Sequence, residues 1–200
     1  MKIYINGLEL EKQATGEMEV GQVLSEIQSE IHADRKVLLQ ASMDGVLIEH
    51  SFRRRRQLST PVTRVEKLEL IVQNPDDVAS QMLKDSVLIY QQLLQEVPMI
   101  ATRFRMGDEY NANQQLAEAV DKLTLSLRGS SLALGKRAET DGLHGRFNTA
   151  GSELMPVIDK ILAAQASGDY TSLADQLEYR LPVALEKCFN VLVESESKLA

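Results

Sequence analysis

Apolar and polar residues alternate along the first part of the chain, and this period of two predicts short strands joined by tight turns. The alternating segment 2–6 runs into Asn6-Gly7, and residues 8–11 are predicted to form the returning strand. Asparagine followed by glycine favours a two-residue hairpin because both central residues of a type I′ turn need a positive φ. The same pattern predicts three more strands, at 36–41, 46–49 and 65–72, with the first two joined by a turn at Asp44-Gly45.

One helix is predicted between the two hairpins, from about residue 20 to residue 32. Its apolar residues recur at the three- and four-residue spacing that places them on one face: Val20, Val23, Leu24, Ile27 and Ile31. The resulting order of hairpin, helix, hairpin, connection and strand is similar to that of ubiquitin-like β-grasp domains. We therefore expect a β-grasp-like domain over residues 1–74. Its sheet should be mixed, with the first and last strands as neighbours and one helix across a face.

Only helical periodicity remains after residue 75, and it predicts a second domain at 76–200. Pro98 lies inside the first helical pattern, where its missing N–H should end or kink the helix. Pro156 is expected in the first turns of a later helix, where a missing N–H costs least. Helices with short connections favour an antiparallel bundle, so the chain as a whole is expected to be α+β. Capping residues and glycines set the expected helix limits: a first helix from Asp76-Asp77 towards Gly107, a second from Asp108-Glu109, a third from Ser152-Glu153 to Gly168, and a last one at about 171–197.

The last helix carries the most regular pattern in the chain. Pro182 interrupts it, because proline removes the hydrogen bond to the Glu178 carbonyl and should bend or split the helix, leaving a groove beside it. Asp175, Glu178 and Glu186 are expected on its solvated side, and Cys188 is expected to be a small buried hydrophobe. Its apolar face is formed by Leu173, Leu177, Leu181, Leu185, Cys188 and Leu192.

The composition supports a packed, helix-rich protein and argues against some classes of function. Of the 200 residues, 44% are hydrophobic, but there is no tryptophan, so aliphatic side chains must fill the core. The net charge of −7 does not favour a nucleic-acid binder. One cysteine cannot form an intrachain disulfide. Because the chain shows neither a signal-peptide pattern nor an apolar run of membrane-spanning length, we expect a cytoplasmic protein without membrane contact.

The most conspicuous charge run is formed by four adjacent arginines, Arg53, Arg54, Arg55 and Arg56. Clustered guanidinium groups could bind phosphate, which keeps a nucleic-acid-binding module open as an alternative function. The run is expected in a loop between strands. Its other interpretations are a solvated loop or a patch for an acidic protein partner.

A second alternative is an enzyme with a site in the loop that holds Asp141, His144 and Arg146, because an acid, an imidazole and a guanidinium can support acid–base chemistry. An ordinary polar loop has the same composition, so no catalytic residue is assigned. His32, His50 and His144 form no metal-spaced pair, and no glycine-rich phosphate loop is present, so neither a metal nor a cofactor is expected. The first domain also lacks the diglycine tail of sulfur and protein-conjugation carriers.

A resemblance to known proteins is confined to the last helix. The stretch Gly168-Asp169-Tyr170, followed by Leu173-Ala174-Asp175-x-Leu177-Glu178-Tyr179-x-Leu181-Pro182, resembles the closing motif of a group of bacterial proteins. That group joins a small N-terminal β domain to a C-terminal helical bundle and has a suspected accessory role in motility. The bundle also resembles four-helix flagellar export chaperones, which hold a disordered partner segment in surface grooves. Arg180 stands where the motif has an acidic residue, and the resemblance brings no catalytic residues.

Together these observations predict a non-enzymatic adaptor or chaperone-like accessory protein that binds a protein partner through bundle grooves and an exposed sheet edge. The residues expected to contact the partner are Arg53 to Arg56, Tyr179 and Pro182. A homodimer through the helical domain is a further expectation, whereas nucleic acid is not the expected partner. The resemblance implies a link to bacterial motility or flagellar assembly.

Overall fold

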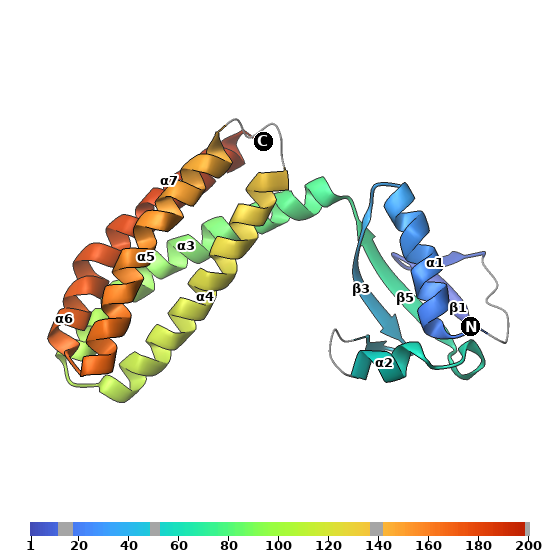
Figure 1. Cartoon of the computed structure of the whole chain (residues 1–200), viewed down its shortest axis with the longest axis horizontal. Coiled ribbons are helices and arrows are strands. Elements are labelled where there is room, and N and C mark those ends of the chain that lie inside the picture. The colour runs from blue at the N-terminus through green and yellow to red at the C-terminus, as the bar shows by residue number, and fades with distance from the viewer. Residues whose placement is uncertain (12–17, 49–52, 137–141, 199–200) are drawn as a thin grey trace. The chain divides into compact units, whose positions relative to one another are not determined.

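The computed structural model describes residues 1–11, 18–48, 53–136 and 142–198. The chain divides into two compact units, Met1–Asp77 and Val78–Ala200. The first contains a five-stranded mixed sheet, and the second is mostly helical (Figure 1). The chain is therefore α+β.

The sheet of the first unit has the order β2-β1-β5-β3-β4. β1 runs parallel to β5, and the other neighbouring strands are antiparallel, so the expected contact between the first and last strands is confirmed. Both hairpin turns have positive φ at their two central residues, 50° and 82° at Asn6 and Gly7, and 50° and 80° at Asp44 and Gly45. The strands are β1 (Lys2–Ile5), β2 (Leu8–Leu10), β3 (Val37–Met43), β4 (Val46–Leu47) and β5 (Lys67–Gln73).

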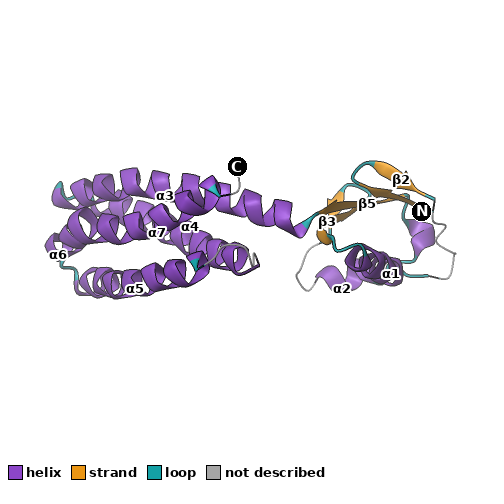
Figure 2. Cartoon of the chain, turned by 90° about the horizontal axis from the view of Figure 1, so that it is seen from above, coloured by secondary structure: helices purple, strands orange, loops and turns teal. Residues whose placement is uncertain are grey.

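One face of the sheet is covered by α1 (Val20–Ala33), as the apolar spacing predicts (Figure 2). The five apolar residues of that pattern are all buried, and they share a core with Ile3, Leu68 and Leu70 of the sheet. A short 3₁₀ turn, η1 (Val62–Arg64), leads into β5. The apolar face of α1 and one apolar face of the sheet are buried against each other, and this burial is the main source of stability for the unit.

The arginine run does not form the expected loop. It opens a short helix, α2 (Arg53–Leu58), which lies against α1. Arginine has a high helix propensity, but the position of the run between two predicted strands indicated a loop. The close approach of α2 to α1 depends on Gly21, because a Cβ added there would lie 3.1 Å from Leu58 Cβ. Only Arg56 has a described side chain in this run, and it is exposed.

The second unit is built from long helices around one apolar core. The residues of that core come from every long helix, and they include Leu83, Leu93, Leu154 and Leu185. Cys188 lies in it and is fully buried, which confirms the expected small hydrophobe. Its elements are α3 (Pro75–Arg105), α4 (Glu109–Lys136), α5 (Leu143–Ser167), α6 (Tyr170–Asp175), the π-helical segment η2 (Gln176–Arg180) and α7 (Leu181–Ser197).

Several predicted helix limits are confirmed and two details are wrong. Gly168 caps α5 with a φ of 69°, as expected. However, α5 already begins at Leu143, so Ser152 does not open a helix and Pro156 lies in the interior rather than the first turns. Pro98 lies inside α3, which runs on to Arg105, so the expected extension of this helix towards Gly107 is confirmed. A proline removes only one backbone donor, and the apolar contacts of Ile100 and Phe104 with the core keep the helix in place.

No helix in the described part of the chain combines the length and the apolar character needed to cross a membrane.

Candidate functional site

A π-helical segment, η2, lies where the sequence analysis expected a bend or a split. The last helix is not split: α6, η2 and α7 follow one another without a break, and Pro182 is at the start of α7. Because proline has no N–H, the residues before it cannot keep the regular α-helical hydrogen bonds. A π turn accommodates this by adding a residue to one turn, and such turns frequently occur at functional sites.

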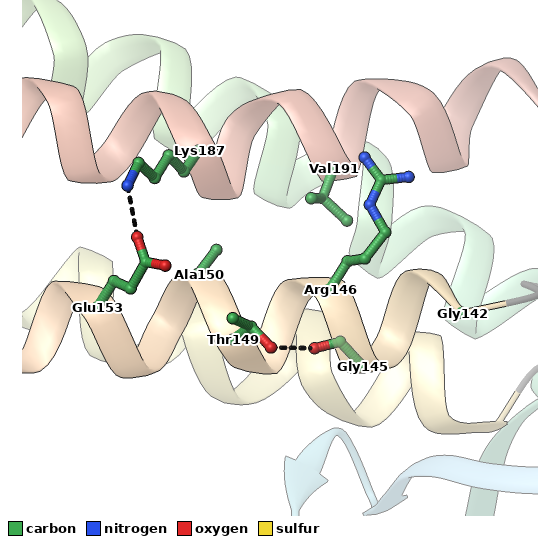
Figure 3. A pocket seen from close by; sticks show the side chains of 8 residues that line it. All are labelled: Gly142, Gly145, Arg146, Thr149, Ala150, Glu153, Lys187 and Val191. Carbon is green, nitrogen blue, oxygen red and sulfur yellow. Dashed lines mark hydrogen bonds and ion pairs between the residues drawn. The ribbon is translucent and has the colours of Figure 1, made fainter.

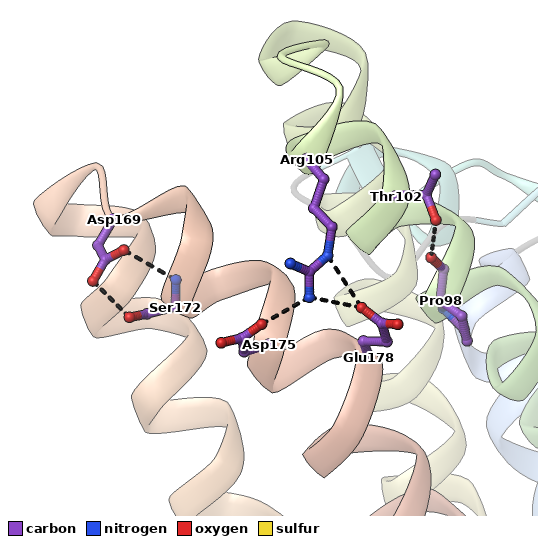
Figure 4. A network of polar contacts seen from close by, with 7 residues as sticks. All are labelled: Pro98, Thr102, Arg105, Asp169, Ser172, Asp175 and Glu178. Carbon is purple, nitrogen blue, oxygen red and sulfur yellow. Dashed lines mark hydrogen bonds and ion pairs between the residues drawn. The ribbon is translucent and has the colours of Figure 1, made fainter.

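A polar network holds η2 against the end of α3 (Figure 4). The guanidinium of Arg105 donates from Nε and Nη2 to Glu178 Oε2, at 3.1 and 2.7 Å, and from Nη2 to Asp175 Oδ1 at 2.7 Å. The side chain of Arg105 is 40% exposed, and those of Asp175 and Glu178 are 51% and 35% exposed. The helical periodicity had suggested a solvated face for these two acids. Both side chains are instead only partly exposed, and both pair with Arg105.

The same network shifts the acidity of its neighbours. Hydrogen bonds to Glu178 and then to Asp175 raise the pKa of Arg105 above its ordinary value. A hydrogen bond to Glu178 also raises the pKa of Tyr179 above its ordinary value. The site thus carries one cation, two carboxylates and a neutral phenol.

Two further contacts fix the surroundings of η2. Phe104 of α3 stacks on Tyr170 of α6, with ring centroids 5.4 Å apart. Asp169 caps α6 by accepting from the Ser172 backbone N–H at 3.0 Å and from the Ser172 hydroxyl at 2.6 Å (Figure 4). These bonds lower the pKa of Asp169. These contacts join α6, which precedes η2, to the end of α3 and cap the first turn of α6.

Large apolar side chains are exposed beside this network. Tyr179 is 59% exposed, and Val183 lies four residues further on and is 56% exposed. Met106, next to Arg105, is 79% exposed, and Tyr110 in the first turn of α4 is 82% exposed. Tyr179 and Val183 are about one helical turn apart, and neighbouring exposed apolar residues mark interaction sites more often than scattered single residues do. We refer to Arg105, Met106, Asp175, Glu178, Tyr179 and Val183 as the η2 surface.

A separate hollow of ≈ 690 Å³ lies between α5 and α7 (Figure 3). Small residues such as Gly145 and Ala150 line it, and charged side chains cross it at both ends. Arg146 donates to Glu194 at 2.6 Å, and Lys187 pairs with Glu153. Because each charge in these two pairs is balanced, the hollow favours neither an anionic nor a cationic ligand. It lies near Lys187 and Val191 rather than at Pro182, where the sequence had predicted a groove.

The residues proposed for an acid–base site do not form the expected loop, because His144 and Arg146 lie in the first turn of α5. Side chains at positions i and i+2 of a helix point about 200° apart around its axis, so those of His144 and Arg146 diverge. His144 Nε2 lies 3.4 Å from Ser131 Oγ of α4 and 3.2 Å from Asn148 Nδ2, whereas Arg146 reaches Glu194 of α7. Asp141 lies outside the described residues. The histidine thus has a packing role between α4 and α5.

The sequence analysis named Tyr179 and Pro182 as candidate contact residues, and it did not name Arg105. The position 73 residues before Glu178 carries no local signal that the two side chains meet. A basic residue in the last turn of a helix is usually explained by the helix dipole alone. Among the described residues, no group of three histidine, cysteine, aspartate or glutamate side chains is arranged to hold a metal ion.

Comparisons with known proteins concern the first unit. Residues 1–74 match a family model described as the TP0873 N-terminal domain. This range covers the whole five-stranded sheet and ends before the long helices. Searches of curated proteins and of solved structures found no match.

Proposed function

We propose that this protein is a non-enzymatic adaptor or chaperone-like accessory protein that binds a protein partner through the η2 surface. The observation that carries the proposal is Tyr179, which is exposed on a π-helical segment tied to α3 by Arg105. Tyrosine is enriched among the residues that dominate binding energy at protein interfaces. Tyrosine has only two side-chain torsion angles, so it loses little conformational entropy on binding.

The finer fold assignment belongs to the same proposal. We assign a β-grasp-like architecture to residues 1–74 and an antiparallel bundle to residues 76–200. The parallel pairing of β1 with β5 supports the first assignment. The contacts of α4 with α5 support the second, since Ser131 meets His144 near one end and Asn113 bonds Gln165 near the other. The link to flagellar export chaperones and motility remains a prediction from the sequence resemblance.

The proposal is tested by quantitative co-purification at native expression level, with three tagged forms of the full chain. The wild type should recover a defined partner, and Tyr179→Ala should recover it at a clearly reduced level. Leu125→Ala is the matched control, because Leu125 is 71% exposed on α4 and lies outside the η2 surface. Equal recovery by all three forms, or no partner with the wild type, would contradict the proposal.

A further inference from the structure

A pocket in the first unit lies at the end of the sheet where β1 and β5 finish and the last turns of α1 lie above them. Its volume is ≈ 470 Å³, within the range of ligand-binding sites. We propose that this pocket binds a peptide segment of a partner protein that carries both apolar and basic residues, with an arginine or lysine side chain lying across it and its charged end at the rim.

The floor of the pocket is apolar. Ile27 and Ile31 come from the inner face of α1, and Val72 comes from β5; all three are buried. Ile5 of β1 and Leu10 of β2 are half-buried and complete the floor. The accessible apolar atoms of Ile5 and Leu10 suit the hydrocarbon stem of a long basic side chain, which packs on them while its charged end stays at the rim.

The walls are fixed by hydrogen bonds before any ligand enters. Asn6 Nδ2 donates to the Val72 carbonyl at 2.8 Å, and the Val72 N–H donates back to Asn6 Oδ1 at 2.9 Å. The Lys36 N–H donates to the Ile31 carbonyl at 2.9 Å, which sets the turn after α1. A preformed pocket avoids much of the ordering cost of binding.

The rim is acidic. Glu30 and Asp34 lie one turn apart at the end of α1, Asp77 comes from the first turn of α3, and Lys36 is the single cation among the lining residues. The C-terminal end of a helix also carries a partial negative charge, which favours a cation beside the last turn of α1. The charge of the rim is therefore complementary to a guanidinium or ammonium group.

The site suits an organic cation on an apolar stem rather than a metal ion. Among the described residues, no three acidic, histidine or cysteine side chains converge as metal ligands, and these carboxylates are part of that set. A peptide is favoured over a free amine because β2 is an edge strand of the sheet. Leu8 on that strand is 76% exposed, so an extended segment beside β2 gains apolar contact and backbone hydrogen bonds.

This inference does not depend on the η2 surface, and its test uses different residues. The probe is a fluorescent five-residue peptide, with blocked ends, in which leucine and arginine alternate. Its affinity for the full chain is measured by fluorescence anisotropy at low salt. The comparison peptide has citrulline in place of arginine, which keeps the shape and removes the charge. Butylguanidinium, tested as a competitor, represents the cation without the peptide.

The variants are a double substitution at the rim, Asp34→Asn with Asp77→Asn, and a matched double control on the helical unit, Asp121→Asn with Asp159→Asn. Each pair removes two negative charges from exposed positions. The rim variant should weaken binding of the arginine peptide about tenfold, as should citrulline, whereas the control pair should change it less than about twofold. Circular dichroism checks that each variant is folded.

Three results would overturn the inference. Equal weakening by the rim and control pairs would show that only the overall negative charge matters. Equal affinity for the citrulline peptide would remove the role of the cation. Competition by butylguanidinium at the same concentration as the peptide would show a small-cation site instead of a peptide site.

Discussion

The guanidinium of Arg105 contacts the carboxylate of Glu178 through two nitrogens, at 3.1 and 2.7 Å, although the two residues are 73 positions apart in the chain. This contact ties the last turn of α3 to the π-helical segment that presents Tyr179. The first prediction follows from it. Arg105→Gln should increase amide hydrogen exchange in 176–181 selectively, because η2 loses its contact with α3.

The global effect of Arg105→Gln should be small, since an exposed ion pair contributes little to stability. We expect a decrease in Tm of at most about 3 °C for a chain of this size. Arg128→Gln is the matched control, because Arg128 is an exposed arginine in the second half of α4. If both variants exchange at the same rate in 176–181, Arg105 does not hold this segment.

The second prediction concerns two buried serines of the helical core. The Ser126 hydroxyl has no hydrogen-bond partner among the described residues, whereas the Ser195 hydroxyl donates to the Leu192 carbonyl at 2.6 Å. Ser126→Ala should raise the free energy of unfolding by about 1 kcal/mol, because it removes an unsatisfied buried group. Ser195→Ala should lower it by about 1 kcal/mol, because it removes a formed hydrogen bond. Urea unfolding of both variants measures the difference, and a shift of the same sign in both would contradict the explanation.

The third prediction is a loss of stability in alkaline solution. Burial raises the pKa of Tyr90 well above its ordinary value of 10.0. Above pH 10 the phenol therefore ionises in the unfolded chain but stays protonated in the folded one. The unfolded state then binds fewer protons, so stability is fully present below pH 10 and falls as the pH rises, by up to about 1.4 kcal/mol per pH unit.

Tyr90→Phe removes this group without removing the ring. Its free energy of unfolding should fall less steeply between pH 10 and 11 than that of the wild type. Burial also raises the pKa of Cys188, so a smaller loss from about pH 9 should persist in the variant. An unchanged slope in Tyr90→Phe would show that the phenol is not responsible.

The fourth prediction concerns acid. Hydrogen bonds from Ser172 depress the pKa of Asp169 below its ordinary value of 3.8. The carboxylate therefore adds stability above about pH 3.8, and this contribution is lost as the pH falls through the depressed pKa. Asp169→Ala should lower Tm at pH 7, and the difference from the wild type should shrink below pH 3.8. A difference that is independent of pH would rule out the charge of Asp169 as its source.

Most elements of the first unit were predicted from the sequence, because short stretches of neighbouring residues specify its turns and its helix. Asn6-Gly7 and Asp44-Gly45 specify tight turns through their backbone requirements, and the apolar spacing of α1 specifies one buried face. The arginine helix α2 was missed, because a six-residue segment has too few residues for periodicity to show. Helices this short depend on their neighbours, here α1 at Gly21.

The sequence was less informative for the helical unit. The start of α5 was missed because Gly142, Gly145 and Gly151 have low helix propensity and masked a regular apolar spacing. That spacing was present, since Leu143, Phe147, Ala150 and Leu154 are all buried on one face. The Arg105 network had no such signal, because the choice of which distant helices meet is made by tertiary packing.

The central claim, that the η2 surface binds a protein partner, is tested most directly by site-specific photo-crosslinking in cells that make the protein at its native level. A benzophenone amino acid is placed at Tyr179 in one form of the chain and at Leu125 in another. Our account predicts one dominant crosslinked protein from position 179, a reduced yield when Arg105→Gln is added, and no such product from position 125. Crosslinks of equal yield from both positions, or none from position 179, would contradict it.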